Sequence, residues 1–156
     1  MSEPPRGDLE FGTIPAMVRA VARQHAEREA LVDVDADVRL DYAEFAEAVL
    51  DAARAFRASG VEPGDRVAIW APNIWEWPVA ALGAQSAGAV LVPLNTRFKG
   101  PEAHYVLQRS GAKVLVTVNG FLGTDYLDML HGASAEEPLT ALSTVVVARG
   151  TLGAGA

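Results

Sequence analysis

The stretch DRVAIWAPNIWEWPVAALGAQSAGAVLVPLNTR, residues 65–97, decides the fold of this chain. Its first part contains a continuous apolar run, 67–71, which is typical of a parallel strand covered on both faces. A second apolar run, 90–94, follows after enough residues to form the helical crossover that two parallel strands require. The stretch therefore predicts a βαβ unit.

The segment between these two runs carries the start and stop signals of a helix. Asn73 is a favourable N-cap, and Glu76 three residues later completes the pattern of a capping box. Gly88 supplies the C-terminal stop. We expect this helix to lie close against a sheet, because small side chains line it: Ala80, Ala81, Gly83, Ala84, Ser86 and Ala87.

Strand and helix signals continue on both sides of this unit. Apolar runs over 114–118 and 144–148 predict two more strands, with room for a crossover before each. Helix starts are predicted at Thr13, Asp41 and Gly100. The alternation predicts an α/β layered domain with a mainly parallel sheet flanked by helices. The remaining expected elements are a hairpin over 30–40, a capping box between Asp41 and Glu44, and a short helix over 121–130.

Composition sets the class of protein. The chain has 156 residues, half of them apolar, which suits one globular domain. Its net charge of −7 argues against nucleic-acid binding, which needs a basic face. No apolar run approaches the roughly 20 residues that a membrane-spanning helix needs. The absence of cysteine excludes disulfides and thiolate metal sites, and it fits the cytoplasmic location that we expect.

The two ends of the chain differ from its middle. The start, MSEPPRGDLEFG, is acidic and rich in proline, so it is neither a secretory signal nor a transit peptide. We therefore expect a flexible N-terminal tail over 1–12 and a folded unit over 13–150. Residues 151–156 are expected to be a tail or a truncation point.

The acidic segment from Asp33 to Glu44 has carboxylates at the spacing of a calcium-binding loop. Such a loop needs glycine at its sixth position, where this chain has the β-branched Val38. An acidic hairpin turn followed by a helix capped by Asp41 is therefore the favoured interpretation, and calcium binding is the alternative.

Two further patterns do not form recognisable sites. The glycines of 150–155 follow a predicted strand, but their spacing is wrong for a dinucleotide-binding loop, so a tail is favoured. His25, His104 and His131 show no metal-ligand spacing, and we expect each of them at the surface. No residue is predicted to be a catalytic group or a metal ligand.

The best binding candidates follow the second strand of the βαβ unit. Asn95, Thr96, Arg97 and Lys99 would lie at the carboxyl end of that strand, where ligands bind in open α/β sheets. Two cations and two small polar groups there could meet a phosphate or a carboxylate, although a solvated loop explains them equally well. Three tryptophans cluster in the sequence: Trp70, Trp75 and Trp77. Core packing is the favoured interpretation, and the wall of an apolar ligand pocket is the alternative.

Residues 65–97, together with PEAHYVLQRSGAKVLVTV over 101–118, resemble the N-terminal segment of the AMP-forming acyl-CoA synthetases, in the adenylate-forming superfamily. The resemblance covers most of 13–148 and includes ALVDVDADVRLDYAEFAEAV and SGVEPGDRVAI. PNIWEWPVAALGAQSAGAVLVPLNTR favours the fatty-acid and aryl-acid CoA ligases over peptide-synthetase domains. FLGTDYLDML is similar to bacterial ligases that act on acids from steroid-ring breakdown.

This resemblance implies a ligase of fatty-acid, lipid or steroid metabolism with a two-step reaction. A carboxylate attacks the α-phosphate of ATP, with Mg²⁺ balancing the phosphate charge, and gives an acyl-adenylate and pyrophosphate. The thiol of CoA then displaces AMP. By the same resemblance, the loop of Asn95, Thr96 and Arg97 lies near the CoA nucleotide. The ATP-binding and catalytic motifs of the family would lie beyond Ala156, so the 156 residues alone are expected to be inactive, as a truncated gene product or a gene fragment.

A second class of function stays open beside the ligase. The chain could be a non-catalytic α/β interaction module, or a remnant that pairs with another polypeptide. A ligase fragment should expose apolar sheet or helix surface where further polypeptide docks. A monomer without such a patch would favour the module.

Overall fold

Helices and strands alternate along the part of the chain that the computed structural model describes, residues 11–151. The helices are α1 (Ile14–Gln24), α2 (Tyr42–Ala58), α3 (Glu76–Ser86), α4 (Gly100–Ser110) and α5 (Tyr126–Ala133), with a 3₁₀ turn η2 (Phe121–Gly123). The strands are β1 (Glu29–Asp33), β2 (Val38–Asp41), β3 (Arg66–Trp70), β4 (Val90–Pro93), β5 (Val114–Val118) and β6 (Thr144–Arg149). Most of the tails predicted over 1–12 and 151–156 lies outside the described residues.

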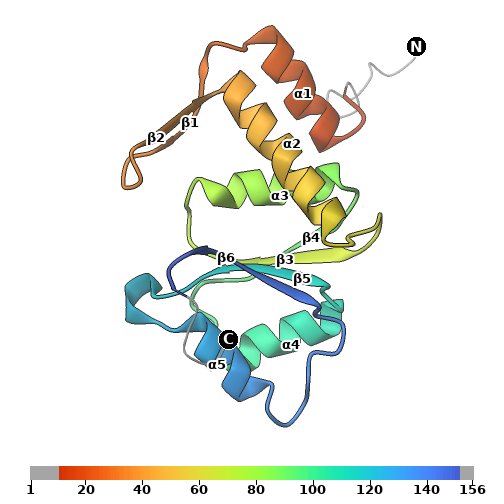
Figure 1. Ribbon diagram of the computed structural model, residues 1–156, viewed down its shortest axis with the longest axis vertical. Coiled ribbons are helices and arrows are strands. Elements are labelled where there is room, and N and C mark those ends of the chain that lie inside the picture. The colour runs from red at the N-terminus through yellow and green to blue at the C-terminus, as the bar shows by residue number, and fades with distance from the viewer. Residues whose placement is uncertain (1–10, 152–156) are drawn as a thin grey trace, which may run out of the picture.

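A parallel sheet of order β4-β3-β5-β6 forms the middle layer of the molecule (Figure 1). In its register Ile69 of β3 pairs with Pro93 on one side and with Val116 on the other. Pro93 is the last residue of β4, as predicted from its missing N–H. Helix α3 lies on one side of the sheet with α2 and α1 beyond it, and α4 and α5 lie on the other side (Figure 1). The predicted α/β fold is therefore confirmed.

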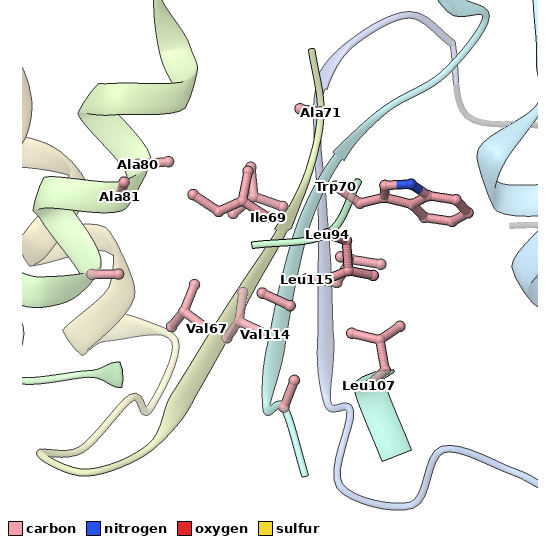
Figure 2. Packing of buried hydrophobic residues seen from close by; sticks show 14 of the residues in the cluster. Val67, Ile69, Trp70, Ala71, Ala80, Ala81, Leu94, Leu107, Val114 and Leu115 are labelled. Carbon is pink, nitrogen blue, oxygen red and sulfur yellow. The ribbon is translucent and has the colours of Figure 1, made fainter. Parts of the chain in front are cut away.

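Alternate side chains of β3 point to opposite faces of the sheet, as its pleat requires. Val67 and Ile69 point toward α3, whereas Trp70 points toward the opposite layer (Figure 2). Leu107 of α4 and Leu115 of β5 lie on the same side of the sheet as Trp70 and belong to the same buried cluster (Figure 2). All five side chains are almost fully buried, so the core occupies both faces of the two central strands.

Helix α3 packs between the sheet and α2, so its small residues serve two contacts (Figure 1). A Cβ atom added at Gly83 would lie 2.6 Å from the Cβ atom of Ala52 in α2. Ala84 is completely buried. The sequence predicted a close approach to the sheet, and the structure adds an equally close approach to a second helix.

The start of α3 differs from the prediction. The helix begins at Glu76 after Trp75, and Asn73 is an exposed residue in the turn before it. The backbone N–H of Trp75 donates instead to Oδ2 of Asp33, 3.1 Å away in the β1–β2 hairpin. The predicted capping role of Asn73 is wrong, because a distant carboxylate serves the start of this helix.

Other local signals are confirmed. Asp41 and Glu44 form the reciprocal hydrogen bonds of a capping box at the start of α2. Thr13 caps α1 through a hydrogen bond from the backbone N–H of Ala16. The predicted hairpin is the antiparallel pair of β1 and β2.

The predicted helix over 121–130 begins later than expected. Gly123 has a φ of +70°, so the chain forms only the turn η2 there. Helix α5 then starts after Asp125, whose side chain accepts a hydrogen bond from the backbone N–H of Asp128. Within the described residues, no helix is long and apolar enough to cross a membrane.

Candidate functional site

The four strands of the sheet are parallel, so the loops that follow them gather at its carboxyl edge. These loops are 71–75, 94–99, 119–125 and 150–151. In open α/β sheets this edge is where ligands bind. The binding candidates predicted from the sequence lie in the second of these loops.

Backbone hydrogen bonds fix the loop of the predicted residues. The carbonyl of Asn95 accepts from Nε1 of Trp70 at 3.0 Å and from the backbone N–H of Phe98 at 3.0 Å. The side-chain oxygen of Asn95 accepts from the backbone N–H of Arg97 at 2.9 Å. The amide of Asn95 therefore shapes the loop, and the Arg97 side chain extends from an ordered support.

Arg97 and Lys99 are exposed, and neither forms an ion pair with any of the residues 11–151. The backbone N–H of Lys99 donates to Oε2 of Glu102 at the start of α4. An exposed guanidinium on a fixed loop suits a phosphate, because it can donate two parallel hydrogen bonds. Of the predicted set, Arg97 thus has the chemistry and the freedom to hold an anionic ligand.

A buried aromatic pair supports the same loop. The hydroxyl of Tyr126 donates to the carbonyl of Thr96 at 3.0 Å. Its ring meets Trp70 edge to face, with ring centroids 4.5 Å apart. Burial raises the pKa of Tyr126, so its hydroxyl stays protonated and keeps donating at neutral pH. Residues of β3 and α5 therefore position Thr96 through its backbone.

A charged cluster at the carboxyl end of β6 was missed in the sequence analysis. Nε of Arg149 lies 2.7 Å from Oε1 of Glu76 in α3, and Nη2 lies 2.7 Å from Oδ2 of Asp33. Hydrogen bonds to Glu76 and then to Asp33 raise the pKa of Arg149 above its ordinary value. The Arg149 hydrogen bond also lowers the pKa of Asp33. This cluster ties the hairpin to the sheet.

The geometry decides between the two interpretations of the acidic segment. Oδ1 of Asp33 accepts from the backbone N–H of Ala36 in the hairpin turn, while Oδ2 meets Trp75 and Arg149. Asp41 caps α2. These two carboxylates of the calcium pattern thus serve the hairpin and the helix, so the hairpin interpretation is confirmed. Among residues 11–151 there is no group of three or more His, Cys, Asp or Glu that could hold a metal ion.

The tryptophan cluster divides between core and pocket. Trp70 is completely buried, as the core interpretation predicts. Trp75 and Trp77 line an open cavity of about 430 Å³ between the β1–β2 hairpin and the start of α3. The core interpretation is therefore confirmed for Trp70, and a ligand pocket at Trp75 and Trp77 stays a prediction.

The predicted surface position of His104 is wrong. Its side chain is buried, and Nε2 donates to the carbonyl of Glu137 at 2.6 Å, which ties α4 to the segment before β6. His131 is exposed, as predicted. In the glycine-rich segment, Gly150 has a φ of +99°, and the segment beyond 151 lies outside the described residues.

Comparison with known proteins gives consistent matches. The family model described as AMP-binding enzyme matches residues 18–153. A 3-[(3aS,4S,7aS)-7a-methyl-1,5-dioxo-octahydro-1H-inden-4-yl]propanoyl:CoA ligase of Rhodococcus jostii is 41% identical over 135 residues, 86% of this chain and 26% of that protein. The ligase of the same name from Mycobacterium tuberculosis is 48% identical over 116 residues, 74% of this chain and 22% of that protein.

A solved structure matches the fold over the same region. The N-terminal domain of FACL13 from Mycobacterium tuberculosis has a TM-score of 0.78 and 30% sequence identity, covering 86% of this chain and 33% of that one. The present chain spans about a quarter of the length of the curated relatives that it matches.

Proposed function

Because the chain belongs to the AMP-binding enzyme family, we propose that it is the N-terminal part of an acid–CoA ligase. In this proposal residues 13–150 form the first part of an adenylation domain. The completed enzyme activates a carboxylic acid with ATP to an acyl-adenylate and transfers the acyl group to CoA. The observation that carries the proposal is the 48% identity, over 116 residues, to a protein named as a propanoyl:CoA ligase.

The acid that we propose is derived from steroid rings. Two relatives from different bacteria carry the name of a ligase for a bicyclic propanoyl group, with 41% and 48% identity to this chain. A fatty acid is the alternative, supported by 31% identity to a solved fatty acyl CoA synthetase of Mycobacterium tuberculosis. The cytoplasmic location expected from the sequence stays a prediction.

We assign Asn95, Thr96 and Arg97 to the binding of the CoA nucleotide. The carboxyl-edge position of Arg97 supports this assignment, as does its exposed guanidinium, which forms no ion pair within residues 11–151. Asn95 and Thr96 contribute by fixing the loop from which Arg97 extends. Arg97 would hold a phosphate of CoA while the pantetheine arm runs toward the acyl-adenylate.

ATP and Mg²⁺ are proposed as ligands of the completed enzyme because the family uses them. No cluster of metal-binding side chains is present among residues 11–151, so we derive no step through Mg²⁺ on this chain. The adenylation chemistry is assigned to further polypeptide, and the 156 residues alone are proposed to be inactive.

An exchange of segments tests this function. The matching N-terminal segment of the Mycobacterium tuberculosis ligase is replaced by the present chain, and AMP release is measured with acid, ATP and CoA. We expect AMP release that requires both the acid and CoA. A chimera that folds, as judged by circular dichroism, and releases no AMP would contradict the proposal.

A non-catalytic interaction module is the second candidate, and the exposed apolar residues of the edge strand β6 do not separate it from the ligase. Val145 and Val146 are 42% and 41% exposed there, so β6 offers an apolar edge to another polypeptide. The same edge suits the ligase, in which further polypeptide would cover it. An inactive but folded chimera, together with capture of a separate partner through β6, would favour the module.

A further inference from the structure

The open cavity between the β1–β2 hairpin and the start of α3 is lined by none of the residues assigned above to CoA binding. Its volume of about 430 Å³ falls within the range of small-molecule sites. One wall is the segment 31–35, which is the end of β1 and the start of the hairpin turn, and the other is the segment 73–78. The two walls are held together by the hydrogen bond between Asp33 and the backbone of Trp75.

The second wall is mainly apolar and aromatic. Trp75 and Trp77 contribute indole rings, and Ile74 and Pro78 contribute apolar surface. All four residues are half-buried, so part of each stays available to a ligand. Indole faces attract cations through their negative π surface, and they also pack against apolar groups.

The first wall supplies negative charge. Asp33 has Arg149 as its counterion, so its carboxylate is balanced within the fold. Asp35 also lines the cavity, is exposed, and has no ion pair or side-chain hydrogen bond with any residue between 11 and 151. Glu76, next to the aromatic wall, shares the same Arg149. Asp35 is therefore the carboxylate of the cavity lining that has no counterion among residues 11–151.

We propose that this cavity binds a small organic cation with an apolar body, such as an arylalkylammonium ion. The ammonium group would meet the carboxylate of Asp35, and the apolar body would lie against Trp75 and Trp77. The carboxylate of Asp35 disfavours ATP, CoA and the carboxylate substrate, all of which are anions. The cavity is thus a second binding site, distinct in charge from the loop of Arg97.

Calorimetric titration of the 156-residue chain tests this proposal with three probes of similar size. Phenethylammonium is the cation, phenethyl alcohol the neutral analogue, and hydrocinnamate the anion. We expect saturable binding of phenethylammonium, weaker binding of the alcohol and no measurable binding of hydrocinnamate. Because the readout is binding and not ligase activity, failure of the ligase proposal would leave this result unaffected.

Matched variants locate the site. Asp35→Asn should weaken phenethylammonium binding about threefold and leave the alcohol unchanged, since an exposed ion pair contributes modestly. Asp37→Asn removes the same charge two residues away, outside the cavity lining, and should change nothing. Trp75→Leu should weaken phenethylammonium about two- to fivefold through loss of the cation–π contact.

Three results would overturn the proposal. The first is no saturable heat with phenethylammonium from a chain that circular dichroism shows to be folded. The second is equal binding of all three probes, which would indicate nonspecific apolar contact. The third is an equal loss from Asp35→Asn and Asp37→Asn, which would indicate overall charge and not this cavity.

Discussion

Arg149 joins three elements through one guanidinium. It is the last residue of β6, and its partners lie in α3 and in the β1–β2 hairpin. The side chains of Arg149, Glu76 and Asp33 are 31%, 21% and 12% exposed. Because these ion pairs are partly buried, solvent and salt screen them less than surface pairs. Removal of one partner should therefore leave an uncompensated charge that destabilises the fold.

Substitution of Arg149 tests how much this cluster contributes to the stability of the fold. Arg149→Ala leaves Glu76 and Asp33 without their shared cation, and we expect a clear fall in the free energy of unfolding, measured by urea denaturation. Arg54→Ala is the matched control, since the Arg54 side chain is 62% exposed in its ion pairs on α2. The control should change stability by less than about 0.5 kcal/mol. Equal effects of the two substitutions would contradict the account.

The lowered pKa of Asp33 should make the stability of the fold depend on pH. The hydrogen bond from Arg149, followed by those from the backbone of Trp75 and Ala36, lowers its pKa below 3.8. The unfolded chain therefore binds a proton at a higher pH than the folded chain does, and stability rises with pH in that interval. The contribution is complete above the ordinary aspartate pKa and is lost as the pH falls through the folded value.

Urea unfolding at a series of pH values between about 6 and 2 checks this prediction. The wild-type chain should lose more stability on acidification than Asp33→Asn, which is already without the carboxylate. Asp65 has a pKa lowered by the backbone N–H of Glu62 and by Lys113, so part of the acid dependence should persist in the variant. Identical pH profiles for the two proteins would show that Asp33 carries no such linkage.

At the scale of elements, the small residues of α3 allow this helix to approach α2 very closely. Gly83 lets α3 approach the backbone of Ala52 and Ala53, with ideal Cβ distances of 3.2 Å or less. A methyl group placed there has no room, because the neighbouring atoms belong to Ala52 and to the backbone of α2.

Two glycine substitutions should therefore have opposite effects. Gly83→Ala should destabilise the chain by about 1–3 kcal/mol through overpacking, despite the higher helix propensity of alanine. Gly132→Ala in α5, where nothing lies within 4 Å of the added Cβ, should stabilise it by about 0.5–1 kcal/mol. Thermal unfolding followed by circular dichroism measures both. A gain in stability from Gly83→Ala would contradict the packing of α2 on α3.

The elements also show what the sequence could and could not predict. Signals within a few residues were sufficient for the capping box of Asp41 and Glu44 and for the strand end at Pro93. The start of α3 depends on Asp33, which is 42 residues away, and no local pattern contains that information. The predicted cap at Asn73 failed for this reason.

One part of the candidate site could likewise be predicted from the sequence, and another part could not. The loop of Asn95–Arg97 could be located because the carboxyl ends of parallel strands bind ligands, and its position there is confirmed. The Arg149 cluster could not be predicted, because its partners are 73 and 116 residues away in the sequence. The packing of the hairpin, α3 and β6 brings these residues together.

At the scale of the whole molecule, the edge strand β6 differs from the two central strands of the sheet. Helices cover β3 and β5 on both faces, whereas Val145 and Val146 of β6 are exposed on adjacent positions that point to opposite faces. An apolar edge strand of this kind invites pairing with another chain.

We expect the isolated 156-residue chain to associate with itself as its concentration rises, measured by sedimentation velocity. Val146→Lys should weaken this association by about tenfold, because a charge on an edge strand opposes pairing. Tyr105→Lys, on the exposed surface of α4, is the control and should have little effect. Association that is equal in all three proteins would exclude β6 as the contact.

The role proposed for Arg97 can be tested only in the chimera, because the proposed CoA site is complete only there. Arg97→Ala should raise KM for CoA about tenfold and leave KM for ATP unchanged, since one charge-assisted phosphate contact is lost. Arg97→Lys should recover part of the loss. A parallel rise of KM for ATP would contradict the assignment of this loop to CoA.

The most direct measurement compares AMP release by the segment-exchange chimera and by the 156-residue chain alone, each with steroid-derived acid, ATP and CoA. The account predicts AMP release by the chimera that stops when either the acid or CoA is left out, and no release by the isolated chain. A folded chimera without this activity, or acid- and CoA-dependent release by the isolated chain, would contradict it.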